Sequence, residues 1–251
     1  ATVATGLTYQ WQSSTNNSTW VNITGATASI FNTTQTASVM YYRCIVTCTA
    51  GGASSNSASI LVNSASGPLY STLPYTESFE TAWSNACNTR DVPNSYWKNT
   101  PATGNNSWRR DDDGTAAAWT STSGAYTPAA SLGARSARFH SFNTTAGTSG
   151  TIDLYVNCNT GIANKRLLYD FINTSGTDSL TVLLSTDGGT TFVRLDSALT
   201  STTWRTKTIY FASTSATSVI RFKATGDLGA TDIGIDNLFL SNWADCSGTP
   251  V

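Results

Sequence analysis

The sequence is poor in charge, in surplus basic residues and in long apolar runs, and each shortage excludes a class of protein. Only 12% of its 251 residues are charged, with 14 Lys and Arg against 15 Asp and Glu. The net charge of -1 lacks the basic surplus with which proteins neutralise nucleic-acid phosphates. No apolar run approaches the roughly 18 residues that span a bilayer. We therefore expect no nucleic-acid partner and no membrane insertion.

The residue patterns of common catalytic sites are also scarce. His140 is the single histidine, and the chain has neither a His-x-x-x-His pair nor a Gly-x-Ser-x-Gly nucleophile elbow. Strand alternation places His140 on the side of Arg138 and opposite Phe139. We interpret His140 as a structural or surface residue and predict that the protein is not an enzyme. Catalysis would require His140, or two carboxylates, to converge in a deep pocket.

Aromatic residues and period-two alternation are abundant and predict an all-β chain. Leu7, Tyr9 and Trp11 alternate with polar residues, and short strands with polar turns indicate a sandwich up to about residue 62. Residues 63–68 have the composition of a linker. A larger jelly roll is expected from about residue 69 to 243, with a turn-rich middle at 83–134. Its clearest strands are expected at 137–142, 151–156, 166–172, 179–185, 190–195, 206–211, 218–224 and 233–240.

Two stretches resemble modules of secreted bacterial surface proteins. Tyr9-Gln10-Trp11-Gln12 and Tyr41-Tyr42-Arg43-Cys44 resemble the immunoglobulin-like repeats of large surface proteins of Bacteroidetes and Flavobacteria. Ser78-Phe79-Glu80, Ser185-Thr186-Asp187-Gly188-Gly189 and Ile233-Gly234-Ile235-Asp236-Asn237 resemble MAM-like and cleaved-adhesin-like jelly rolls. Such modules are adhesive, carbohydrate-facing or architectural.

The resemblance implies three segments. Residues 1–66 would form an Ig-like sandwich that is incomplete at its N-terminus, and residues 67–243 a larger MAM-like jelly roll. The tail, residues 244–251, resembles the first strand of a following Ig-like module. Proteins of this kind commonly reach the cell surface by type IX secretion. We therefore expect an extracellular adhesion or structural module, and as the alternative a carbohydrate-binding module appended to a secreted enzyme.

Acidic residues of the second domain are candidates for a structural calcium site. In jelly rolls similar to this one, the ligands come from the acidic residue after the first strand and one in the last strand. By position these are Glu80 and Asp236, joined by Asp113 from an acidic run that supplies further oxygens. The alternative is that the run pairs with the arginines before it and that Asp236 caps a bend.

Glycans enter the expectations in two ways. Exposed indoles stack on sugar rings, so tryptophans of the irregular middle are candidates for a glycan-binding platform; the alternative is that they anchor long loops. Asp-Ser-aliphatic triplets at Ser179 and Ser197 fit the pattern at which bacteria of the inferred kind attach O-glycans. The candidate platform consists of Trp83, Trp97, Trp108 and Trp119.

The chain has five cysteines, an odd number, so they cannot all pair with one another. Cys44 and Cys48 lie on one predicted strand about 13 Å apart, beyond the roughly 7 Å Cα separation of a disulfide, so each needs another partner. Cys87 and Cys158 both belong to the second domain and are expected to pair. Cys246 remains in the tail.

These features together lead to a hypothesis of assembly. An N-terminal sandwich that is short of a strand could accept the tail of a neighbouring copy, locked by a disulfide from Cys246 to Cys44 or Cys48. A contact of this kind does not close and builds a filament. The alternative is that the chain is a piece of a long multidomain adhesin. The expected partners are neighbouring copies or adjacent modules of the same protein, and glycans.

Overall fold

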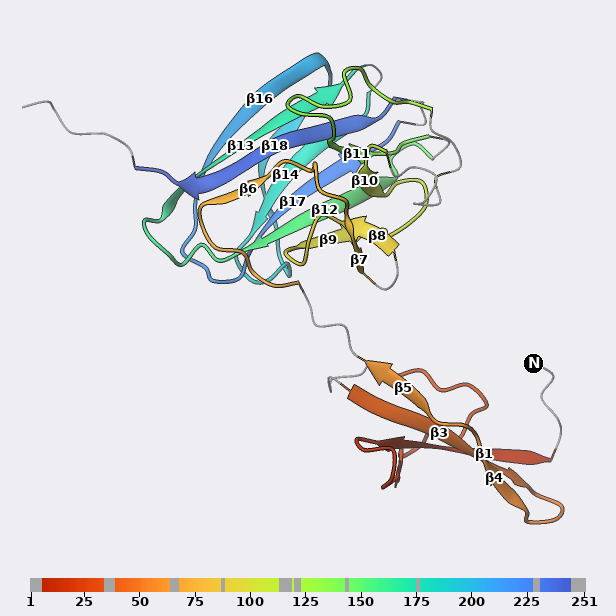
Figure 1. The fold of residues 1–251 in the computed structure, drawn as a ribbon. Coiled ribbons are helices and arrows are strands. Elements are labelled where there is room, and N and C mark those ends of the chain that lie inside the picture. The colour runs from red at the N-terminus through yellow and green to blue at the C-terminus, as the bar shows by residue number, and fades with distance from the viewer. Residues whose placement is uncertain are drawn as a thin grey trace, which may run out of the picture. The chain divides into compact units, whose positions relative to one another are not determined.

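The computed structural model describes residues 6–33, 39–63, 68–86, 89–112, 119, 123–142, 145–174, 177–227 and 231–244. Every regular element in these ranges is a β-strand, which confirms the predicted all-β class. The chain divides into two compact units, residues 1–67 and 68–251 (Figure 1). Nothing in the described ranges has the helical length or hydropathy of a membrane span.

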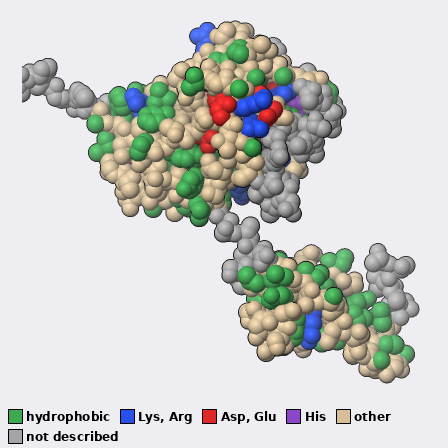
Figure 2. Space-filling view, viewed as in Figure 1, with side chains coloured by type: hydrophobic (Ala, Val, Ile, Leu, Met, Phe, Trp, Pro, Cys, Tyr) green, Lys and Arg blue, Asp and Glu red, His purple; other side chains and the backbone are tan. Residues whose placement is uncertain are grey.

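The first unit is a single antiparallel sheet. β1 (Leu7–Ser14) lies between β2 (Val21–Asn22) and β3 (Val39–Cys48). The other edge of β3 pairs with β4 (Ser54–Asn56) and then with β5 (Ile60–Asn63). Hydrophobic side chains lie at the surface of this unit (Figure 2).

The register of the first unit separates its two faces. Trp11 lies opposite Cys44, and Tyr42 lies opposite Ile60. Directly opposed residues in an antiparallel pair share a face, so Trp11, Cys44, Tyr42 and Ile60 lie on the same side. The predicted alternation of β1 is thereby confirmed.

The second unit consists of two antiparallel sheets and a small hairpin, β7 (Ser84–Ala86) and β8 (Thr89–Val92). One sheet has the order β10 (Trp108–Arg110), β11 (Ala137–Phe139), β18 (Ile233–Asn242), β13 (Asn164–Asn173), β16 (Ser201–Ala212), with β6 (Tyr75–Glu77) on β18 beside β11. The other has the order β15 (Val193–Ala198), β14 (Ser179–Ser185), β17 (Ser218–Thr225), β12 (Ser149–Val156), β9 (Trp97–Thr100).

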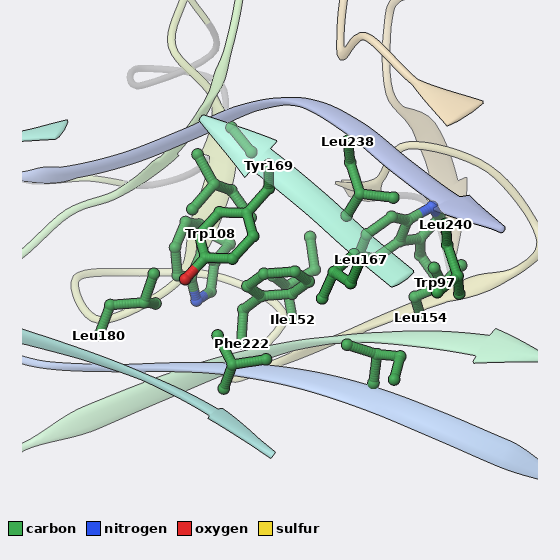
Figure 3. Close-up of a cluster of buried hydrophobic side chains, with 14 of the residues drawn as sticks. Trp97, Trp108, Ile152, Leu154, Leu167, Tyr169, Leu180, Phe222, Leu238 and Leu240 are labelled. Carbon is green, nitrogen blue, oxygen red and sulfur yellow. The ribbon is translucent and has the colours of Figure 1, made fainter. Parts of the chain in front are cut away.

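The core of the second unit is formed by side chains that alternate inward from both sheets (Figure 3). Leu167 and Tyr169 of β13 face Ile152 of β12 and Phe222 of β17, and none of the four is more than 1% exposed. The rings of Tyr169 and Phe222 meet edge to face with centroids 5.2 Å apart. Burying a large apolar side chain stabilises a fold by about 1.5–3 kcal/mol, so this layer holds the sheets together.

All eight strands expected after residue 134 are present, and β14 has the predicted bounds. The turn after β14 is built as its sequence indicates: Gly188 and Gly189 have φ angles of +74° and +94°. The Asp187 carboxylate accepts hydrogen bonds from the N–H groups of Thr190 and Thr191. Four further short strands, β7 to β10, lie in the middle region that was expected to be rich in turns.

Candidate functional site

The first unit leaves one face of its sheet uncovered by the described residues. A groove of 680 Å³ runs over this face. Ile60 is 64% exposed and Val62 38%, although both are apolar residues of a strand. Phe31 covers part of the face, with its ring stacked on Trp11 at a centroid distance of 5.7 Å. The open face is defined here by Trp11, Phe31, Tyr42, Cys44, Ile60 and Val62.

The open face is unusual because a sheet normally buries its apolar side against a second layer. Among the described hydrophobic residues of the first unit, only Ala26 and Cys44 are buried. The second unit, in contrast, encloses a continuous core between two sheets. The first unit therefore presents half of a sandwich.

The opposite face of the same sheet carries hydrogen-bonded polar side chains beside apolar residues such as Ile45 and Leu61. Gln12 donates from Nε2 to Asn22 Oδ1 at 2.8 Å, and its Oε1 accepts from Arg43 Nε at 2.8 Å. The Arg43 guanidinium also lies 4.3 Å above the ring of Trp20. The groove, however, lies on the open face.

The cysteines of β3 lie on the open side of the sheet. Cys44 is 6% exposed and lines the groove, and burial raises the pKa of its thiol. Cys48 lies opposite Leu7, further along the same strand. Neither forms a disulfide with a described cysteine, nor does the buried Cys158. Cys87 and Cys246 lie outside the described residues, so the pairings predicted for them stay predictions.

The four tryptophans predicted as a glycan platform are all buried, and this prediction is wrong. Trp83 and Trp97 are 3% exposed, Trp108 is 0% and Trp119 is 6%. Their indole nitrogens bond inward in three cases: to Tyr75 Oη, the Gly150 carbonyl and Ser107 Oγ. The indoles anchor long segments to the core, which was the alternative interpretation.

Glu80 and Asp236, the described members of the predicted calcium set, both bind main-chain N–H groups of one loop, residues 131–135. Glu80 Oε1 accepts from the N–H groups of Ala134 and Arg135 at 2.8 and 2.9 Å. Asp236 Oδ2 accepts from the N–H groups of Ser131 and Leu132. These N–H groups donate to the two oxygens, so the two carboxylates hold residues 131–135 in place. Asp113 lies outside the described residues, and calcium at this set stays a prediction.

The alternative interpretation, in which the acidic run pairs with the arginines before it, holds for Asp112 and Arg110. Asp112 pairs with Arg110 at 2.7 Å and with Arg135 at 3.3 Å. Arg109 instead points inward, is fully buried and donates to the carbonyls of Trp108 and Ala102. Acidic and basic side chains accordingly gather on one part of the second unit in Figure 2.

His140 lies in a buried network and has no access to solvent. Its Nδ1 is 2.9 Å from Asp232 Oδ2, the oxygen that also accepts from Arg138 Nε. The Trp119 ring stacks on the imidazole at a centroid distance of 4.6 Å. The predicted placement of Arg138 and His140 on one side is confirmed. Since the ring is 0% exposed, the arrangement supports a structural role.

The two predicted O-glycan acceptors differ in exposure. Ser197 is exposed on β15, whereas Ser179 is partly buried at the start of β14. The aspartate before Ser179 is 1% exposed. Glycosylation at both positions stays a prediction.

A second partly exposed aromatic site, which the sequence reasoning missed, lies on the outer side of the β13–β16 pair. Tyr210 is 56% exposed, and its ring centroid is 5.3 Å from that of Trp243. The Arg166 guanidinium lies 4.4 Å above the Trp243 ring. Tyr210 and Trp243 border a hollow of 560 Å³ together with Asn164 and Phe211. The outward alternation of β16 could have indicated Tyr210, because Ile209 and Phe211 point inward.

Comparison with known proteins gives a family match to the first unit only. Residues 1–64 match a family described as a domain of unknown function (DUF8696). No curated protein sequence matches the chain.

Among solved structures, the chain is similar to the K1 cleaved adhesin domain of Lys-gingipain from Porphyromonas gingivalis. The identity is 14% and the TM-score 0.47, over 68% of this chain and 99% of that domain. The carbohydrate-binding module TmCBM61, solved with β-1,4-galactotriose, is 14% identical with a TM-score of 0.43, over 66% and 94%. The xylan-binding CBM22-1 domain of Paenibacillus barcinonensis Xyn10C is 11% identical with a TM-score of 0.40, over 68% and 95%.

Proposed function

We propose that the chain is a non-catalytic adhesion or structural module of an extracellular bacterial surface protein, and that it joins a neighbouring polypeptide through the open face. The observation that carries this proposal is the open face itself. A groove of 680 Å³ lined by apolar side chains is left without a second β-layer among the described residues. Large exposed apolar surfaces of this kind mark sites of protein contact.

The groove is suited to an extended β-segment. Ile60 and Val62 of β5 both point toward it, and β5 pairs with β3 along one edge only in the described part of the unit. An added strand would bury these side chains. Covering the exposed part of Ile60 is expected to contribute about 1–2 kcal/mol, and that of Val62 about half as much.

The proposed donor is the C-terminal segment of a neighbouring copy, residues 244–251. It resembles the first strand of an Ig-like module and contains Cys246. Because Cys44 lies in the groove, an extracellular oxidant such as molecular oxygen could take two electrons and two protons from the Cys44 and Cys246 thiols, and the resulting disulfide would lock donor and acceptor together. Each copy would then accept one strand and donate another, and repetition of this contact builds a filament. An adjacent module of a longer adhesin would occupy the same face in the same way.

Oligomeric state and thiol chemistry test this function. We expect the oxidised protein to form ladders on non-reducing gels and multimers in light scattering, and Cys246→Ser to remove the covalent ladder. Cys48→Ser is the matched control, because Cys48 is not among the residues that line the groove. A chain that stays monomeric at all concentrations, with Cys44 and Cys246 both freely alkylated, would contradict donation between copies.

Carbohydrate binding remains the second candidate because of the hollow beside Tyr210. A partly exposed tyrosine and tryptophan offer stacking surfaces, and Asn164 and Arg166 offer hydrogen bonds to hydroxyl groups. Binding to a glycan array should then be lost in Tyr210→Ala and kept in Tyr155→Ala, a tyrosine of the other sheet. Equal binding by both variants would remove this candidate.

A further inference from the structure

A cluster of oxygen atoms lies at the end of the sandwich where β14 begins and β17 ends. The pairing of these strands brings Asp178, just before β14, next to Asp227, just after β17. The Asp227 N–H donates to Asp178 Oδ1 at 2.6 Å. Asn173, the last residue of β13, donates from Nδ2 to the main-chain oxygen of Asp178 at 2.9 Å and to that of Leu199. Three separate segments of the chain thus meet at Asp178.

Two oxygens of this cluster, Asp178 Oδ2 and Asn173 Oδ1, are buried and receive no hydrogen bond from the described residues. Asp178 is 1% exposed and Asn173 is 0% exposed, so bulk water does not satisfy them. Turning the Asn173 amide over would not help, because its nitrogen already donates to two carbonyl oxygens. The described residues therefore leave both atoms without a donor, a role that a proton, a water molecule or a cation can fill.

None of the described residues that act on the Asp178 carboxyl is positively charged. Burial and the Asp227 carboxyl raise the pKa of Asp178 to about 7, and the nearby Ser141 hydroxyl lowers it. The Ser141 proton itself is donated to the Thr231 carbonyl at 2.7 Å. The N–H and the hydroxyl of Thr177 donate to Asp227 Oδ2. Asp178 Oδ2 and Asn173 Oδ1 are therefore the oxygens of this cluster that still need a positive partner.

We propose that Asp178, Asp227 and Asn173 form a binding site for one calcium ion. Ca²⁺ takes about 6–8 oxygen ligands at roughly 2.3–2.6 Å, accepts carboxylate, amide and main-chain oxygens together, and tolerates irregular geometry. It would satisfy both oxygens that lack donors and neutralise the repulsion between the two carboxyl groups. Mg²⁺ fits less well because it demands a near-octahedral set and retains its waters. These residues are distinct from the set at Glu80, Asp113 and Asp236.

The competing explanation is a proton held on Asp178 and shared with a neighbouring oxygen. Calorimetric titration of the full chain with CaCl₂, after dialysis against EDTA, separates the two. We expect one site that Asp178→Asn weakens at least tenfold and that Glu80→Gln, the control at the other acidic site, leaves unchanged. No calcium binding would favour the proton and overturn the proposal. Binding that survives Asp178→Asn, or that is lost in Glu80→Gln instead, would also overturn it.

A second variant covers the case in which Asp178→Asn does not fold. Asp227 is only partly buried, so Asp227→Asn should keep its unfolding temperature in EDTA within a few degrees of the parent. We expect it to weaken calcium binding at least tenfold and to reduce the rise in unfolding temperature on adding CaCl₂. Magnesium at the same concentration should give a smaller rise. Unchanged calcium affinity in a folded Asp227→Asn would overturn the proposal.

Discussion

Replacing Ile60 by lysine should separate association through the open face from the stability of the chain. Ile60 is 64% exposed, so little of its side chain packs within the unit. Full burial of an isoleucine contributes about 1.5–3 kcal/mol, and covering the exposed part therefore about 1–2 kcal/mol. Since about 1.4 kcal/mol is tenfold in affinity, Ile60→Lys is expected to weaken association roughly five- to thirtyfold. The free energy of unfolding should change by no more than about 0.5 kcal/mol.

Leu61 supplies the matched control for this experiment. It is the next residue of β5, is 47% exposed and points to the opposite face of the sheet. Leu61→Lys should leave association unchanged in sedimentation velocity over a concentration series, and urea denaturation of both variants checks their folding. If the two variants weaken association equally, or if neither does, the reasoning about the open face is refuted.

Three further changes test the second unit. Trp108→Ala removes a fully buried indole and should cost about 3–5 kcal/mol of unfolding free energy in urea, and an unchanged midpoint would contradict its anchoring role. In Gly133→Ala the new Cβ would meet Glu80 Oε1, and the residue would keep the φ of +82° that Gly133 has. We expect this change to lower Tm, and to lower it less when Glu80 is also replaced by Ala. Equal losses of Tm in the two backgrounds would refute the clash. The Ser185 hydroxyl holds the pKa of Asp187 below its usual range, so this carboxylate stabilises the fold above about pH 4 and loses that effect on acidification. Tm of Asp187→Asn should therefore fall less steeply between about pH 4 and pH 2 in circular dichroism, and parallel curves would argue against it.

Much of the second unit could be predicted because its strands have a clear period. β14 alternates over its first four residues, continues as an apolar run and is followed by Asp187-Gly188-Gly189, so its bounds follow from the sequence. β9 and β10, with four and three residues, are too short for a period to be recognised. They become strands by pairing with β12 and β11, which is a tertiary effect.

The sites were harder to predict, because burial and partners arise from the whole fold. A tryptophan such as Trp119 in an irregular segment fits an anchor and a binding platform equally well, and only the closing of the two sheets decides. His140 and Asp232 are 92 residues apart, so no local pattern connects them. In the sequence, Asp178 is notable only as the residue before Ser179, a predicted glycan acceptor. That Asp178 Oδ2 and Asn173 Oδ1 are buried without a described donor cannot be predicted from a sequence pattern.

The pairing of β6 with β18 has a mechanical consequence. Tyr75 lies opposite Leu240, and because the strands are antiparallel the chain enters and leaves the second unit at the same end. A pulling force between these two ends first loads the main-chain hydrogen bonds that the N–H groups of Leu69 and Ser71 donate. It then separates β6 from β18 one residue pair at a time. Because the end of β18 also pairs with β13, from Lys165 opposite Asn242 to Leu167 opposite Leu240, the same pull loads that pair of strands. A string of such modules would therefore yield first at the end where the chain enters and leaves each unit.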